Sequence, residues 1–339
     1  YDPTIAIHDD WQLRDIVTNR FGSAATTDIL TLHRETYLQE ADLDNIIRLG
    51  VNFVRLPIYY RDIRELDANG NWVGSAFRFD HIDRIVDLCA DRGLYVLVDL
   101  HGAPGGQSAQ DNTGHMDFNK LFAQTSEGLV YRTRTVELWR EVARRYRNNT
   151  TVVGYDLLNE PAGARRPDSE QPPEQQSPAL LWQLYDQLYD AIRAEDPNHL
   201  IVMEGLWKDL WTGLDDWDTL PSPASQGWTN VAYQFHYYCW DCVTDPDPDP
   251  NNPAVRPLPV PVAVQEQEQR NFLDGKFAEA EPAQAAYDVP VMIGEFSGFG
   301  VRQVWKDYLN RFNQHGWSWA SWSYKTHDSP SEWGLYTHL

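Results

Sequence analysis

VVGYDLLNEP, residues 152–161, and VPVMIGEF, residues 289–296, decide the fold of this chain, because each holds an apolar, β-branched run that leads to a glutamate. A continuous apolar run is typical of a strand in a buried parallel sheet, where an ionised carboxylate is costly unless it has a partner or a chemical task. Each strand delivers its glutamate, Glu160 or Glu295, at the C-terminal end. The two stretches therefore predict a pair of carboxyl groups facing each other across a barrel mouth, the arrangement that cleaves glycosidic bonds.

Patterns typical of strands and helices alternate along the 339 residues. Strands are predicted at residues 51–59, 94–101, 152–159, 200–204, 231–238, 289–295 and 317–324, and helices at residues 40–49, 80–92, 129–147, 178–195, 264–280 and 301–315. Asp80 is expected to cap the second helix and Gly93 to end it. The alternation predicts an α/β protein with a parallel sheet, and the length suits a single-domain (β/α)8 TIM barrel over residues 1–339. The first barrel strand is then expected before residue 51, at Thr4–Ile7 or ahead of Tyr1 and outside this numbering.

The charge and the aromatic content restrict the class of ligand. Lys and Arg number 28 against 50 Asp and Glu, a net charge of −22 that repels nucleic acid and anionic membranes and favours a monomer. The substrate is accordingly expected to be neutral or cationic. The 14 Trp and 17 Tyr suggest a cleft for sugar rings, with ordinary core packing as the alternative for most of them. No apolar stretch of about 18 residues is present, and a chain that begins at Tyr1 without Met suggests a removed signal peptide and secretion.

The cysteines and two long loops leave alternatives open. Cys89 lies in a helical pattern and is expected to be an inert buried thiol. Cys239 and Cys242 form a Cys-Trp-Asp-Cys loop that suits a disulfide or two thiols, whereas zinc would need further ligands. DPDPDPNNP, residues 245–253, predicts an extended solvated loop, with Ca²⁺ binding as the alternative. This loop and the one at residues 161–178 are expected to shape the substrate cleft.

Glu160 and Glu295 are the predicted catalytic residues. A retaining glycosidase needs one protonated carboxyl group for the leaving oxygen; Glu160 is predicted as this acid/base, with Asn159 placed to bond the sugar 2-hydroxyl. The alternative is that the Asn-Glu-Pro sequence is an ordinary helix-start turn. Glu295 follows Gly294, whose missing side chain lets other groups approach, and is predicted as the nucleophile. Its alternative is a strand-end ion pair with a cation such as Arg55.

Other polar and aromatic residues at strand ends are predicted to line the site. Arg55 is expected to keep the nucleophile ionised, to belong to a structural ion pair, or both. His101 ends the next strand, and His236 and Tyr238 share one face of a later one. Tyr238 is expected to bond the nucleophile and His236 to position the acid, although a lone histidine is more often structural. Trp322 is expected to form the floor on which the sugar stacks.

The ordered set of motifs resembles glycoside hydrolase family 5, the cellulase family, over most of the chain. The matching motifs are Arg55-x-Pro57, His101, Asn159-Glu160-Pro161, His236-x-Tyr238, Gly294-Glu295 and Trp322. The resemblance implies a retaining double displacement on a neutral oligo- or polysaccharide, with neither a cofactor nor a metal ion. Within it, Glu160 and Glu295 take the catalytic roles and the other motif residues bind substrate.

Three stretches resemble the exo-β-1,3-glucanase branch of that family. They are HRETYLQEADL (33–43), DLHGAPGGQ (99–107) continuing to Asp111-Asn112, and YKT (324–326) leading to Ser331-Glu332-Trp333. Ser108-Ala109 stands where that branch has an Asn, the segment after Tyr238 differs, and the Gly- and Trp-rich first-strand motif is absent. The resemblance favours a β-1,3-glucan or a β-glucoside and leaves exo and endo action open.

Endo-β-1,4-glucanase is the alternative, followed by hydrolases of β-mannan, β-1,6-glucan or diglycosides. Two alternatives of other classes are a non-catalytic carbohydrate-binding barrel and a metal-dependent hydrolase, for which no ligand motif is found.

Overall fold

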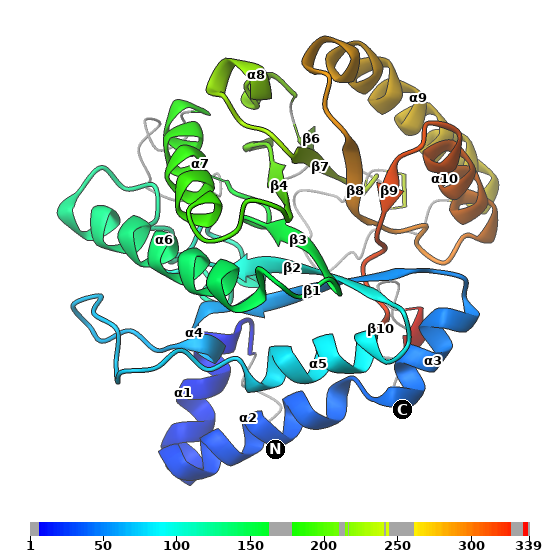
Figure 1. The fold of residues 1–339 in the computed structure, drawn as a ribbon. Coiled ribbons are helices and arrows are strands. Elements are labelled where there is room, and N and C mark those ends of the chain that lie inside the picture. The colour runs from blue at the N-terminus through cyan, green and yellow to red at the C-terminus, as the bar shows by residue number, and fades with distance from the viewer. Residues whose placement is uncertain are drawn as a thin grey trace, which may run out of the picture. The chain divides into compact units, whose positions relative to one another are not determined.

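A computed structural model describes residues 7–162, 178–209, 214–215, 217–240, 242–243, 261–326 and 335–337 (Figure 1). The chain divides into two compact units, Tyr1–Leu206 and Trp207–Leu339, and each is described by itself. The Asp-Pro loop at 245–253, residues 163–177 of the earlier loop, and Ser331-Glu332-Trp333 lie outside the described residues. What the sequence predicts for these segments stays a prediction.

The first unit is built on four parallel strands. They are β1 (Phe53–Tyr59), β2 (Tyr95–Gly102), β3 (Val152–Asp156) and β4 (Leu200–Glu204), in the order β1-β2-β3-β4. The register sets Arg55 beside Leu97 and Asp99 beside Asp156. Because every strand runs the same way, their C-terminal residues gather at one edge of the sheet, where part of the predicted site belongs.

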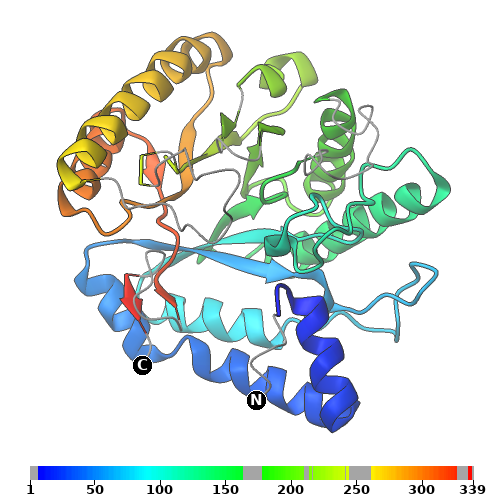
Figure 2. The ribbon, with the colours of Figure 1, turned by 180° about the vertical axis from the view of Figure 1, so that it is seen from behind.

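Helices follow or precede each of these strands. They are α1 (Asp10–Phe21), α2 (Ser23–Tyr37), α3 (Glu40–Arg48), α4 (Tyr60–Ile63), α5 (Asp80–Ala90), η1 (Asp111–Thr113), α6 (Ser126–Tyr146) and α7 (Pro178–Arg193). Helix α5 packs against β2 and α6 against α7, with Trp139 of α6 fully buried and donating its indole N–H to the Leu157 carbonyl at 3.0 Å. Figures 1 and 2 show α2 following α1 at an angle, and the two helices are in contact.

One of the two predictions for the ends of α5 needs correction. Asp80 is the first residue inside α5 and not its cap: the N-cap is Phe79, which makes no side-chain capping bond. The Asp80 carboxylate still lies in the first turn, where the helix dipole favours negative charge. Gly93 does lie just past the helix end, with a φ of 67° that suits glycine.

The second unit has a smaller parallel sheet. Strands β7 (Val231–Tyr237), β8 (Val291–Phe296) and β9 (Ser318–Trp319) pair in that order, with His236 beside Glu295. The helices are η3 (Trp217–Thr219), α8 (Pro223–Gln226), α9 (Val262–Tyr287) and α10 (Arg302–Gln314), and the short strand pairs are β5 (Trp207–Asp209) with β6 (Leu214–Asp215) and β10 (Lys325–Thr326) with β11 (Tyr336–Thr337). Phe277 of α9 and Phe312 of α10 are buried in its aromatic core.

The strands expected from residue 51 onward all form: β4 has the predicted bounds, β2 is shifted by one residue, and the others are shorter than or shifted from their apolar runs, β9 most of all. Between residues 7 and 50, all of which the structure describes, the secondary structure is helical, so no barrel strand lies there. The first strand at Thr4–Ile7 therefore stays a prediction, since residues 1–6 lie outside the described part. The single-domain organisation likewise stays a prediction.

The structure confirms a buried thiol at Cys89 and, of the two alternatives for Cys239 and Cys242, the disulfide. Cys89 is fully buried in α5, and burial raises the pKa of its thiol to about 11, as expected for an inert side chain. Cys239 and Cys242 form a disulfide, with a Cα–Cα distance of 5.3 Å. Among the described residues, no helix combines the length and the apolar character that crossing a bilayer requires.

Candidate active site

Arg55 is the centre of a buried polar cluster in the first unit. From β1, its Nε donates to Asp156 Oδ2 at 2.8 Å, and its Nη2 donates to Asn159 Oδ1 at 2.9 Å. The same Nη2 lies 3.2 Å from Asp99 Oδ1 and 3.3 Å from Glu204 Oε1. Neighbouring strands thus point their carboxylates at one guanidinium, whose flat shape suits several acceptors at once. The alternative of a structural ion pair for Arg55 is confirmed, while its action on Glu295 stays a prediction.

The cluster holds more carboxyl groups than its arginine neutralises. Burial raises the pKa of Asp156 from its ordinary value of 3.8 to about 7; Arg55 opposes this shift, and Asp99 and Glu204 add to it. Because Arg55 already fills the centre of these carboxylates, the cluster presents an internal cation rather than a place for a metal ion.

Asp156→Asn tests this shift through the pH dependence of stability. In the wild type, the folded state holds a proton on Asp156 that the unfolded state releases above about pH 4, so this group's contribution falls as the pH rises towards 7. Asparagine cannot ionise and still accepts the Arg55 hydrogen bond. We expect the free energy of unfolding of the variant, relative to wild type, to increase between pH 4.5 and pH 8 in urea titrations. If the free energies of unfolding of the wild type and the variant changed with pH in the same way, Asp156 would be ionised throughout this pH range.

The side-chain amide of Asn159 has a hydrogen-bond partner for its oxygen but none for its nitrogen among the described residues. Its side chain is fully buried, Oδ1 accepts from Arg55, and its backbone carbonyl accepts from Gln107 Nε2 at 2.9 Å. The structure contains no acceptor for Nδ2 within the part of the chain it describes. An unpaired buried N–H is expensive, so a group that accepts from it upon binding recovers that free energy. The geometry fits the predicted bond to a sugar hydroxyl.

Glu160 follows in a strained backbone position. Its φ is 45°, in the left-handed region that costs a residue other than glycine about 1–3 kcal/mol and recurs at functional sites. Two contacts hold it: the Glu160 N–H donates to Glu204 Oε2 at 2.8 Å, and the Asn112 amide donates to Glu160 Oε2. The residue is almost completely buried. The backbone therefore fixes where this carboxyl points, and Asn112 fixes its orientation.

His101 is oriented by a neighbouring carboxylate. Its Nδ1 lies 2.8 Å from Asp99 Oδ2, two residues earlier in β2, and its carbonyl accepts from Gln107 Nε2 at 2.8 Å. A carboxylate beside Nδ1 places a proton on that nitrogen and sets the role of the other one. The histidine predicted to bind substrate thus has a fixed ring.

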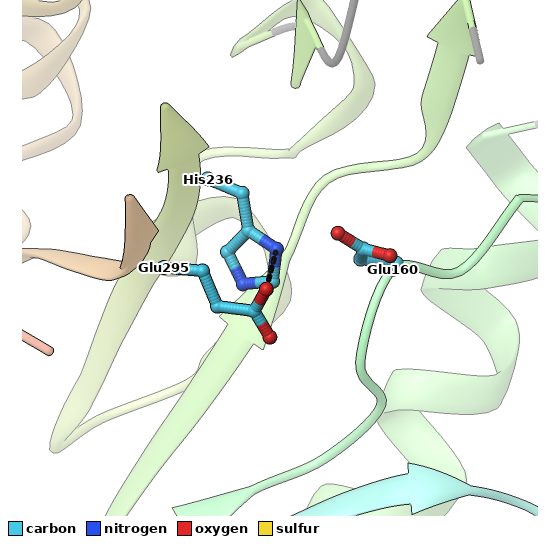
Figure 3. A group of neighbouring side chains, drawn as sticks. All are labelled: Glu160, His236 and Glu295. Atoms are coloured by element: carbon cyan, nitrogen blue, oxygen red, sulfur yellow. Dashed lines mark ion pairs between the residues drawn. The ribbon is translucent and has the colours of Figure 1, made fainter. Parts of the chain in front are cut away.

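Glu295 in the second unit is held by the two residues predicted to lie near it. Tyr238 donates its hydroxyl to Glu295 Oε2 at 2.8 Å, the hydrogen bond expected from the sequence. His236 Nδ1 lies 3.6 Å from the same oxygen, the ion pair drawn in Figure 3. At Gly294 a Cβ atom would overlap the Gln234 side chain, which explains the glycine before the glutamate. The role of His236 in positioning the acid stays a prediction.

Trp322 lies half-buried beyond β9, and its backbone N–H donates to the Phe296 carbonyl at 3.2 Å, next to the end of β8. Near Tyr238, the rings of Trp240 and Phe299 lie 5.1 Å apart, and the disulfide encloses Trp240. The predicted stacking of a sugar on Trp322 stays a prediction.

Several site residues escaped the sequence analysis although a signal for them was present. Asp99, Asp156 and Glu204 are carboxylates inside or at the end of apolar strand runs, the same pattern that singled out Glu160 and Glu295. Gln107 and Asn112 lie in the loop after β2, in stretches quoted above without a role for either residue; only the fold brings Gln107 to the Asn159 carbonyl and Asn112 to Glu160. Among the predicted residues, the first unit brings together Arg55 and Asn159, and the second unit His236, Tyr238 and Glu295.

Parallel strands whose C-terminal ends carry oriented carboxylates are the arrangement expected of a barrel glycoside hydrolase. The chain belongs to the cellulase family, glycosyl hydrolase family 5, whose model matches residues 17–328. It is 29% identical to a β-xylosidase from Phanerodontia chrysosporium, over 93% of this chain and 62% of that protein. It is also 30% identical to a glucan 1,3-β-glucosidase from Lachancea kluyveri, over 64% of this chain and 46% of that protein. The chain thus spans about half to three fifths of the length of these relatives.

Solved structures show the fold. The chain matches a hyperthermophilic endo-β-1,4-glucanase with a TM-score of 0.62 at 19% identity, covering 88% of this chain and 84% of that one. It matches endo-glycoceramidase II from Rhodococcus sp. with a TM-score of 0.61 at 21% identity, covering 88% and 70%. The fold is the (β/α)8 barrel, as the sequence predicted.

Proposed function

We propose that this protein is a retaining β-glucosidase or β-glucanase acting on β-1,3-linked glucose, with Glu295 as nucleophile and Glu160 as acid/base. The observation that carries the proposal is the different environment of the two glutamates. Glu295 receives a phenolic hydrogen bond and faces an imidazole, which orient an attacking carboxylate. Glu160 is buried in a strained turn, and the Asn112 amide donates to its Oε2, which fixes the direction in which this carboxyl can present a proton.

The proposed reaction has two steps. Glu295 attacks the anomeric carbon while Glu160 protonates the departing glycosidic oxygen, and a covalent glycosyl-enzyme forms. Glu160 then takes a proton from water, which attacks the same carbon and releases Glu295. Retention in this way needs the two carboxyl groups about 5–5.5 Å apart. The Asn159 N–H that lacks a partner in the described residues is aimed by Arg55 to bond the sugar 2-hydroxyl.

The linkage is proposed from two kinds of similarity. The branch motifs at residues 33–43 and 99–107 resemble exo-β-1,3-glucanases, and a relative at 30% identity is named a glucan 1,3-β-glucosidase. A second candidate is hydrolysis of β-xylosides, because the relative aligned over 93% of this chain is named a β-xylosidase. The acidic composition suits a neutral sugar polymer and a monomeric enzyme, and the fungal relatives fit secretion.

A substrate panel with product sizing tests the function. We expect the protein to hydrolyse laminarin faster than carboxymethylcellulose, mannan, pustulan or xylan, without loss after EDTA treatment. Glucose as sole product indicates exo action, and a ladder of oligomers indicates endo action. NMR of the first-formed anomer checks retention. Preference for cellulose or xylan would replace the β-1,3 assignment, and binding of laminarin with no hydrolysis of any substrate would indicate a carbohydrate-binding barrel.

A further inference from the structure

The start of helix α1 is fastened to the loop that follows β2. The Trp11 N–H donates to the Gly114 carbonyl at 2.9 Å, and the Met116 N–H donates to Asp9 Oδ2 at 2.7 Å. The other oxygen of Asp9 caps the helix by accepting from the Gln12 N–H at 2.7 Å. One buried carboxylate thus joins the helix start to the loop.

A column of stacked side chains strengthens this junction. The Arg61 guanidinium carbon lies 4.2 Å from the centre of the Trp11 ring, on the side of α4. Trp11 stacks on His115 with centroids 4.2 Å apart and planes 5° apart, and His115 stacks on Phe118 at 4.5 Å and 13°. Phe118 in turn meets Tyr131 of α6 edge to face at 5.9 Å. Aromatic rings prefer a few stacking geometries, so this column fixes the position of the 111–118 loop relative to α1 and α6.

The opposite end of the same loop touches the acid. Asn112 belongs to η1, two residues before Gly114, and donates to Glu160 Oε2. Two hydrogen bonds close the turn between them: the Gly114 N–H donates to the Asp111 carbonyl at 2.9 Å, and Thr113 Oγ1 donates to the Gln110 carbonyl at 2.8 Å. A shift of Gly114 therefore moves Asn112.

We propose that Asp9 and Trp11 of the amino-terminal helix are positioning residues for the acid/base: through the 111–118 loop they hold Asn112 against the Glu160 carboxyl. This inference rests on the proposed function of Glu160. Trp11 and His115 are half-buried and stack on each other at the far side of the loop from Asn112, so the proposed effect is mechanical. Small displacements of a catalytic group cost rate steeply, and an acid contributes most where the leaving group needs a proton.

Trp11→Ala tests the proposal through leaving groups. We expect kcat/KM for an alkyl β-glucoside, whose leaving group must be protonated, to fall about tenfold. For 2,4-dinitrophenyl β-glucoside, whose leaving group departs unprotonated, we expect less than about a twofold change. The ratio of the two constants on one enzyme sample does not depend on how much protein is folded. Trp11→Phe keeps a ring on His115 and should restore the wild-type ratio.

Phe21→Ala is the matched control, because it removes an exposed aromatic ring from the far end of the same helix. It should leave the ratio unchanged. Equal losses of Trp11→Ala on both substrates, or no loss on either, would overturn the positioning role. Failure of the proposed function looks different: the wild type would then hydrolyse neither glucoside, or Glu160→Ala would not reproduce the selective loss on the alkyl glucoside.

Discussion

Glu295→Gln is expected to lose essentially all hydrolysis, with kcat/KM lower by about 10⁴-fold or more. Glutamine matches the shape of the carboxylate and still accepts from the Tyr238 hydroxyl, so the side chain keeps its place beside β7. The amide oxygen is a poor nucleophile, and it carries no charge to stabilise the cationic character of the transition state. Initial rates on 2,4-dinitrophenyl β-glucoside measure the loss without involving the acid.

Glu268→Gln provides a control with the same change of charge, on the exposed face of α9, and should retain wild-type rates. Mass spectrometry adds a direct test, since a 2-deoxy-2-fluoro glucoside should label the wild type at Glu295 and leave Glu295→Gln unmodified. Retention of more than about one hundredth of the activity by Glu295→Gln, or a label on another residue, would contradict the assignment.

Glu160 and Glu295 could be predicted from the sequence because a carboxylate that follows an apolar, β-branched run is unusual. The same reasoning reaches Asp99, Asp156 and Glu204, yet it cannot separate a carboxylate that neutralises Arg55 from one that performs chemistry. That distinction depends on register: Asp99 pairs with Asp156 across β2 and β3, and no periodicity within one strand specifies its neighbour. The structural ion pairs of Arg55 can therefore be recognised only once the neighbouring strands are in place.

The two amino-terminal helices were not predicted because their stabilising contacts are polar. The buried side chain of α1 is Arg14, which lies beside Asp10 of its own helix and donates to Asp62 of α4 at 2.6 Å. A helix attached by ion pairs and caps shows little apolar periodicity, the signal on which helix prediction from sequence rests. Asp9 caps α1, and its second bond, to the loop after β2, joins residues 107 positions apart, which no local signal in the sequence indicates.

Arg55→Met is expected to produce the largest loss of stability. It leaves the buried carboxyls of Asp99, Asp156 and Glu204 without the cation that bonds or faces each of them. Removing one partner from a buried ionic cluster costs about 3–5 kcal/mol, because the remaining charge stays out of water without compensation. We expect urea unfolding at pH 7.5 to show a decrease of this size in the free energy of unfolding.

Arg145→Met is the matched comparison, since its guanidinium is half-exposed and pairs with Asp83 on the surface, where an ion pair contributes about 1 kcal/mol or less. The loss caused by Arg55→Met should also depend on pH. Burial raises the pKa of Asp156 and Arg55 opposes this rise, so without the guanidinium the protonated form of Asp156 is favoured further and the deficit should shrink as the pH falls from 7.5 towards 5. A deficit that is small, or equal at both pH values, would show that the carboxylates do not depend on Arg55 for their charge.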